Sequence, residues 1–111
     1  MLRLWREASG DISSLDKPVR LRAQEQLRRL CVHPKTNHAL SGALAGCYSV
    51  EVARRYRIVF RLILGSGELQ VIAVGKRENL EVYRIAAERV ANHALEAEQH
   101  DDPENRTAEP N

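Results

Sequence analysis

Two neighbouring stretches of the chain alternate apolar and polar residues with a period of two, which is the pattern of half-buried β-strands. Residues 47–52 read CYSVEV and residues 56–64 read YRIVFRLIL, with only residues 53–55 to connect them. A third apolar run, residues 69–75, follows the turn sequence GSGE. Connections this short predict a meander of three antiparallel strands.

The same alternation divides the side chains of the predicted sheet between two faces. One face is apolar and is expected to pack on helices, whereas the other is expected to lie open to solvent. The open face would carry Ser49 and Glu51 from the first strand and Arg57 and Arg61 from the second. Lys76 and Arg77 follow at the end of the third strand. Because like charges repel, four cations gathered on one surface predict a bound anion.

Apolar residues at helical spacing flank the sheet on both sides in the sequence. Asp16 is a capping residue, Pro18 fits a first turn, and His33-Pro34 ends the helix that they begin. The apolar stripe of this helix consists of Val19, Ala23, Leu27, Leu30 and Cys31. A second helix is predicted over about residues 78–92.

The first residues, MLRLW, predict a short strand, and residues 6–15 predict a weak helix. The predicted fold is therefore α+β, with N-terminal helices packed on a small, antiparallel, twisted sheet that a C-terminal helix follows.

The composition is that of one soluble domain, with 111 residues of which 43% are hydrophobic. No apolar run approaches the roughly 20 residues of a membrane-spanning helix. The N-terminus lacks the pattern of a secretory signal, which predicts a cytoplasmic protein. The spacing of Cys31, Cys47 and the four histidines predicts no metal site, and no cofactor is expected. Both cysteines are predicted to be structural.

The charge divides the chain into two parts. Residues 93–111 hold six acidic residues and one basic residue, Arg106. Of the totals of 17 basic and 15 acidic residues, 16 and 9 therefore belong to residues 1–92. The acidic segment has two prolines and no aromatic residue, and is predicted to be a disordered tail. The basic domain, residues 1–92, favours a polyanionic partner.

Two segments resemble the RelE branch of the RelE/ParE toxins of bacterial type II toxin-antitoxin systems. These are LSGALAGCYSVEVARRYRIVFRLI and IAVGKRENLEVYRIAAERV, and the resemblance covers about residues 15–92. It implies the RelE/ParE-like α+β fold and a ribosome-dependent mRNA endonuclease that blocks translation. The implied partners are the ribosome, with mRNA in its A site, and a cognate antitoxin that silences the toxin.

The resemblance also implies roles for individual residues. Arg57 matches an arginine that contacts the scissile phosphate, and Arg77 matches one implicated in phosphate stabilisation and leaving-group protonation. Tyr83 matches a tyrosine that stacks on or orients the nucleotide, although its place on the apolar stripe would by itself predict a core residue. The best-known RelE proteins carry two lysines where this chain has Ser49 and Glu51.

Cleavage of RNA without a metal ion takes a base for the 2′-hydroxyl, cations around the phosphorane and an acid for the leaving oxygen. Arginine suits the second task because its guanidinium stays charged and offers two parallel donors to phosphate oxygens. Glu51 is a candidate base, although an ion pair with Arg57 or Arg61 is the favoured interpretation. Lys76, Arg61 and Ser49 are predicted to contact RNA, with solvated surface or an antitoxin contact as the alternatives for the two cations.

Two further functions stay open. One is a ParE-like inhibitor of DNA gyrase without chemistry of its own. The feature that argues against it is Tyr83 after GKRE, since ParE-type chains generally lack this tyrosine. The other is a weakened toxin that retains mainly antitoxin binding, because the two lysines of its relatives are replaced.

Overall fold

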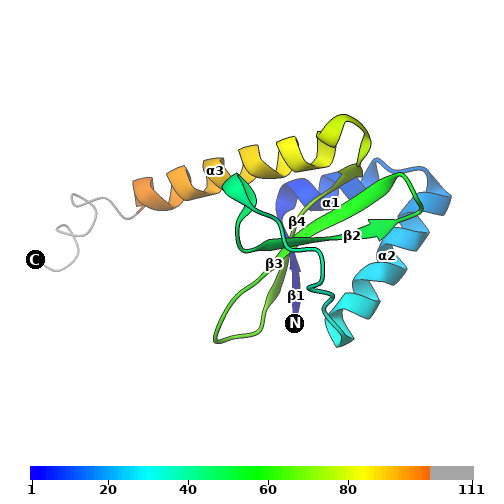
Figure 1. Cartoon of the computed structure of the whole chain (residues 1–111), viewed down its shortest axis with the longest axis horizontal. Coiled ribbons are helices and arrows are strands. Elements are labelled where there is room, and N and C mark those ends of the chain that lie inside the picture. The colour runs from blue at the N-terminus through cyan, green and yellow to red at the C-terminus, as the bar shows by residue number, and fades with distance from the viewer. Residues whose placement is uncertain (101–111) are drawn as a thin grey trace, which may run out of the picture.

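A computed structural model describes residues 1–100 of the chain. The elements run in the order β1 (Leu2–Leu4), α1 (Arg6–Ser13), α2 (Lys17–Val32), the 3-10 turn η1 (Gly42–Leu44), β2 (Cys47–Val52), β3 (Tyr56–Leu62), β4 (Leu69–Lys76), the 3-10 turn η2 (Glu78–Leu80) and α3 (Glu81–His100). The structure confirms the α+β class, with helices before the main strands and one helix after them (Figure 1).

The sheet has four strands in the order β1-β4-β3-β2. Strands β2, β3 and β4 form the predicted antiparallel meander. The short N-terminal strand β1 is also present, and it pairs in parallel with β4, so that Leu2 lies opposite Leu69 and Leu4 opposite Val71. The sheet is therefore mixed, whereas the sequence predicted an antiparallel one. A parallel pairing across more than 60 residues leaves no signal in the local pattern.

Helices cover both faces of the sheet, and the prediction of one open face is wrong. Helix α3 lies on the opposite side of the sheet from α2 (Figure 1). A Cβ added at Gly75 would lie 3.5 Å from the Cβ of Val82 in α3, so a small residue lets this helix approach the strand. Ser49, expected on the open face, is only 2% exposed. Helical periodicity shows which side of α3 is apolar but not which face of a sheet it covers.

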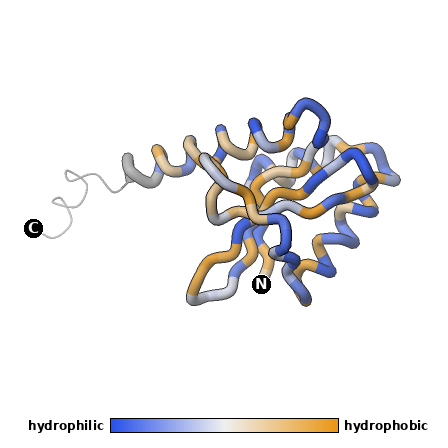
Figure 2. The backbone as a smooth tube through the Cα atoms, viewed as in Figure 1, coloured by the Kyte–Doolittle hydropathy of each residue, from blue (hydrophilic) through white to orange (hydrophobic). Residues whose placement is uncertain are grey.

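The core is contributed mainly by the strands. Phe60, Ile58, Val59 and Val71 are fully buried, as is Leu30 of α2. The central strands carry mostly apolar residues, whereas apolar and polar residues alternate along the helices (Figure 2). Each such buried side chain stabilises the fold by about 1.5–3 kcal/mol relative to the exposed state. No helix of the described residues is both long and apolar enough to cross a membrane.

The predicted bounds of α2 are confirmed. Asp16 is the N-cap residue, although its side chain makes no capping hydrogen bond, and proline occupies the first turn. The helix ends at Val32 because His33 turns to extended geometry (φ −134°) before Pro34. Cys31 is exposed, so its placement on the apolar stripe and its structural role are wrong. It follows buried Leu30 by one residue, which is about 100° around the helix.

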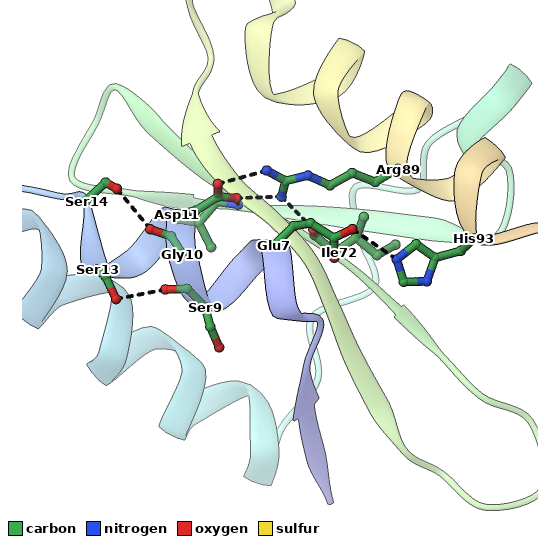
Figure 3. Close-up of polar contacts among 10 residues, drawn as sticks. Glu7, Ser9, Gly10, Asp11, Ser13, Ser14, Ile72, Arg89 and His93 are labelled. Atoms are coloured by element: carbon green, nitrogen blue, oxygen red, sulfur yellow. Dashed lines mark hydrogen bonds and ion pairs between the residues drawn. The ribbon is translucent and has the colours of Figure 1, made fainter. Parts of the chain in front are cut away.

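Helix α3 continues to His100, so the predicted end near Asn92 is wrong. His93, expected in the tail, stacks on Trp5 with ring centroids 3.7 Å apart. Its Nε2 also lies 3.3 Å from a carboxylate oxygen of Glu7 (Figure 3). These contacts of His93 with Trp5, the N-cap residue of α1, and with Glu7 extend the folded domain beyond residue 92. The rest of the predicted tail, residues 101–111, lies outside the described residues.

A half-buried ion pair joins α1, β4 and α3 (Figure 3). Arg89 donates to both carboxylate oxygens of Asp11, at 2.7 and 2.9 Å, and to the backbone oxygen of Ile72 at 3.0 Å. The backbone N–H of Val74 donates to Asp11 as well, at 2.9 Å. The hydrogen bonds to Asp11 raise the pKa of Arg89. Strand β1 pairs with β4 only as far as Val71. The side chains of Asp11 and Arg89 therefore satisfy backbone groups of Ile72 and Val74, which lie past the end of that pairing.

Candidate functional site

Arg57 and Arg77 lie at the same end of the β3-β4 pair. Arg57 is opposite Gly75, and the backbone N–H of Arg77 donates to the oxygen of Arg55 at 2.8 Å. This bond extends the ladder by one residue beyond the Tyr56–Lys76 pair. Because faces alternate along a strand, Arg77 continues the face of Gly75 and Arg57. The structure therefore brings the two predicted arginines to one surface.

Lys76 does not share that surface. It is opposite Tyr56, one position out of step with Gly75, and so belongs to the other face of the sheet. Its exposed side chain lines a pocket with Tyr56, Asp16 and Glu81 on that side. The prediction that Lys76 joins Arg57 and Arg77 on one face is wrong. Side chains alternate between the two faces of the sheet up to the last residue of β4, which is Lys76.

Arg57 is half-buried, and its Nε is buried without a hydrogen-bond partner among the described residues. Glu51 is its neighbour across the β2-β3 ladder. Within residues 1–96, whose side chains the structure describes, the ion pairs join Arg3 to Glu68, Arg29 to Glu25, Arg89 to Asp11 and His93 to Glu7. The favoured ion pair of Glu51 with Arg57 or Arg61 is therefore wrong. Glu51 is exposed and its carboxylate is not engaged by either arginine.

Tyr83 sits in the first turn of α3, where its half-buried side chain packs against the core. Its hydroxyl lies 3.4 Å from the Ser49 hydroxyl. Ser49 stands diagonally across the β2-β3 ladder from Arg57, at a Cα separation of roughly 7–8 Å. Tyr83 thus combines the core position that its spacing predicts with a hydroxyl that reaches Ser49. Ser49 presents almost no surface to a ligand in this conformation.

Arg61 lies away from the other arginines. It is four residues from Arg57 along β3, or roughly 13 Å in an extended strand. Its Nε donates to the side-chain oxygen of Gln70 at 3.0 Å, and its guanidinium lies 5.1 Å from the centre of the Trp5 ring. Trp5 in turn stacks on His93. The structure therefore places Arg61 in a packed cluster under α3 and does not bring it to Arg57 and Arg77.

Two arginines that the sequence interpretation passed over line a pocket beside Arg77. The pocket has a volume of about 270 Å³ and is lined by Arg54, Arg55, Arg77 and Glu78. Arg54 and Arg55 belong to the β2-β3 connection, which the period-2 pattern treats only as a short link. Two consecutive arginines directly before the YR strand were the available signal. Their proximity to Arg77 depends on the strand register, which becomes apparent only in the structure.

Among the side chains that the structure describes, those of residues 1–96, no three His, Cys, Asp or Glu side chains come close enough together to hold a metal ion. The thiol of Cys47, the first residue of β2, is buried, and burial raises its pKa. A thiol in this state is a weak nucleophile and a weak metal ligand. The titratable and charged groups at the site are therefore arginines, glutamates and Tyr83.

No family model matches the chain. An Escherichia coli protein that bears the name RelE-like toxin protein is 31% identical over 85 residues, which cover 76% of this chain and 90% of that protein. Among solved structures, a double arginine mutant of E. coli toxin RelE in the free state matches with a TM-score of 0.68 and 28% identity, over 80% of this chain and 95% of that one. The same RelE mutant in complex with a peptide of the antitoxin RelB matches with a TM-score of 0.62 and 28% identity, over 78% and 92% of the two chains.

Proposed function

Because the chain belongs to the RelE/ParE superfamily, as a RelE-like toxin of a toxin-antitoxin system, we propose that it is an endoribonuclease that cuts mRNA on the ribosome and so inhibits translation. A ribosomal target would place the protein in the cytoplasm. A cognate antitoxin is the second proposed partner, since a related RelE is known in complex with a RelB peptide.

One observation carries the proposal. Arg57 and Arg77 share one face at one end of the β3-β4 pair, and neither has a carboxylate within 4 Å among the described residues. The buried Nε of Arg57 also has no partner there. An unsatisfied buried donor costs about 1–3 kcal/mol, and such groups are typical of sites that await a ligand. A phosphate would supply both the missing acceptor and the missing negative charge.

The proposed reaction is metal-independent attack of a 2′-hydroxyl on the neighbouring phosphate. The 2′-oxygen forms a bond to phosphorus, the bond from phosphorus to the 5′-oxygen breaks, and a cyclic phosphate and a free 5′-hydroxyl result. Arg57 and Arg77 stabilise the charge that develops on the phosphorane oxygens. Tyr83 orients the nucleotide through the part of its ring that is not packed on the core.

Two proton transfers accompany this step. Glu51 is the proposed base for the 2′-hydroxyl, because its exposed carboxylate faces the same side as Arg57 and is free of the ion pair that would have occupied it. Arg77 is the proposed proton donor to the leaving 5′-oxygen. A guanidinium holds its proton tightly and is a poor acid, so the transfer would occur only as the strongly basic oxygen departs.

The test is primer extension on ribosome-bound mRNA after induced expression. We expect cuts within A-site codons, and we expect Arg57→Ala and Arg77→Ala each to lower the cutting rate by ~10²-fold or more, as the loss of a preorganised charge should. Arg28→Ala, an exposed position on α2 at a distance from the site, is the matched control and should cut normally. Full cutting by both site variants would show that the assigned site is wrong.

The same experiment separates the other functions of this superfamily. A gyrase inhibitor would leave mRNA intact and block DNA supercoiling in a purified assay. A weakened toxin would do neither and would still bind its antitoxin. The structural likeness to a YoeB/ParE toxin from Agrobacterium tumefaciens, at 19% identity and a TM-score of 0.59, supports the common fold only.

A further inference from the structure

We propose that Arg54 and Arg55 form a second phosphate subsite beside Arg77, which holds the RNA phosphate next to the one that is cut. The inference rests on the proposed function for the identity of the ligand, a single-stranded RNA backbone. It assigns a role to two residues outside the set that performs the reaction.

The first support is the position of the turn. The backbone oxygen of Arg55 accepts the 2.8 Å hydrogen bond from the N–H of Arg77, so the turn is fixed to the end of β4. Arg54, Arg55 and Arg77 together with Glu78 line the pocket of about 270 Å³. Arg55 directly precedes β3 and stands two residues, or at most roughly 7 Å, from Arg57. The cations therefore follow one another along the end of the sheet, as contacts to successive phosphates require.

The second support is the charge of the pocket. Three of its four lining residues are arginines, and none of them lies within 4 Å of a carboxylate among the described residues. Arg54, Arg55 and Arg77 are all exposed. Mutual repulsion of three unpaired cations disfavours this arrangement unless an anion binds. Guanidinium groups match phosphate oxygens with two parallel donors, which favours a phosphate as that anion.

The third support is the backbone of the turn. Ala53 and Arg54 adopt left-handed conformations, with φ of 48° and 62°. Each costs roughly 1 kcal/mol in a residue other than glycine. The N–H of Arg55 donates to the oxygen of Ala53 at 2.6 Å and closes the turn. A closed turn presents its two arginines from a fixed backbone, so less entropy is lost when they bind a phosphate.

The test is the salt dependence of binding to a single-stranded oligoribonucleotide with 2′-O-methyl groups, which cannot be cut. Affinity is measured by fluorescence anisotropy with the full chain over a series of salt concentrations. Each phosphate contact contributes about 0.7 to the slope of log affinity against log salt. Because the two arginines hold one phosphate, we expect Arg54→Ala/Arg55→Ala to lower the magnitude of that slope by about 0.7. Arg54→Lys/Arg55→Lys keeps the charges and should keep the slope.

The matched control is Arg6→Ala/Arg28→Ala, which removes one exposed arginine from α1 and one from α2. We expect it to leave the slope unchanged. An equal fall in the control, an unchanged slope in the turn variant, or no binding by the wild-type chain would each overturn the subsite. Circular dichroism melts of every variant show that a lost slope does not reflect unfolding.

These outcomes are independent of the proposed nuclease. A wild-type chain that shows the expected slopes but never cuts mRNA would remove the proposed function and leave a phosphate subsite. A chain that cuts mRNA, and whose slope the turn variant does not change, would remove the subsite and leave the nuclease.

Discussion

At the scale of the residue, the two cysteines have opposite surroundings that their sequence context did not distinguish. Cys31 is exposed on α2, whereas Cys47 is 4% exposed at the start of β2. Burial raises the pKa of Cys47, so little of it is thiolate near neutral pH. We expect an aromatic disulfide reagent to label one thiol quickly in the native protein and both after denaturation. Cys31→Ser should remove the fast phase, and its persistence in this variant would contradict the assignment.

At the scale of the element, the position of α3 depends on the pair of Asp11 and Arg89. Arg89→Met would leave the half-buried Asp11 with its bond from Val74 alone, and we expect a loss of about 2–3 kcal/mol in the free energy of unfolding. Urea unfolding followed by circular dichroism measures the change. Arg84→Met, at an exposed position of the same helix, should change stability by no more than about 0.5 kcal/mol. Equal shifts in both variants would show that the pair does not hold the helix.

At the scale of the whole molecule, acid should loosen the contact between the two ends of the folded chain. The pKa of Glu7 lies below its ordinary value of 4.5, chiefly because of its own backbone N–H in the first turn of α1, with His93 and Arg89 adding to the effect. A carboxylate with a lowered pKa contributes stability above its unfolded value, and this is lost as the pH falls through the folded value.

We therefore expect Glu7→Gln to be less stable than the wild type at neutral pH. The gap should narrow as the pH falls below about 4.5, because the wild type then loses the same charge. Denaturant unfolding at a series of pH values measures both curves. Glu96→Gln, an exposed carboxylate further along α3, controls for the loss of one negative charge. A gap that stays constant down to acid pH would contradict the role of Glu7.

Part of the site could be predicted from sequence because part of it is local. The period-2 pattern placed Arg57 and Glu51 on the same face of the sheet, and the register, in which the two residues lie opposite one another, confirms this. The resemblance in VGKRE and EVY pointed to Arg77 and Tyr83. Arg77 lies at the same end of the β3-β4 pair as Arg57, and the Tyr83 hydroxyl lies 3.4 Å from that of Ser49. Lys76 was assigned to the wrong face because a shift of one position along a strand moves a side chain to the other face. Arg61 was assigned to the site because it shares a face with Arg57, but it lies four residues further along the strand.

The sequence by itself determined the three antiparallel strands, the bounds of α2 and the α+β class, since these follow from residue periods of a few positions and from turn and capping residues. Only the tertiary structure decided the parallel pairing of β1, the placement of α3 over Ser49 and Gly75, and the meeting of Arg54 and Arg55 with Arg77. These depend on contacts between residues far apart in the chain. Such contacts are set by the packing of complementary surfaces, and periodicity along one segment does not encode which other segment it meets.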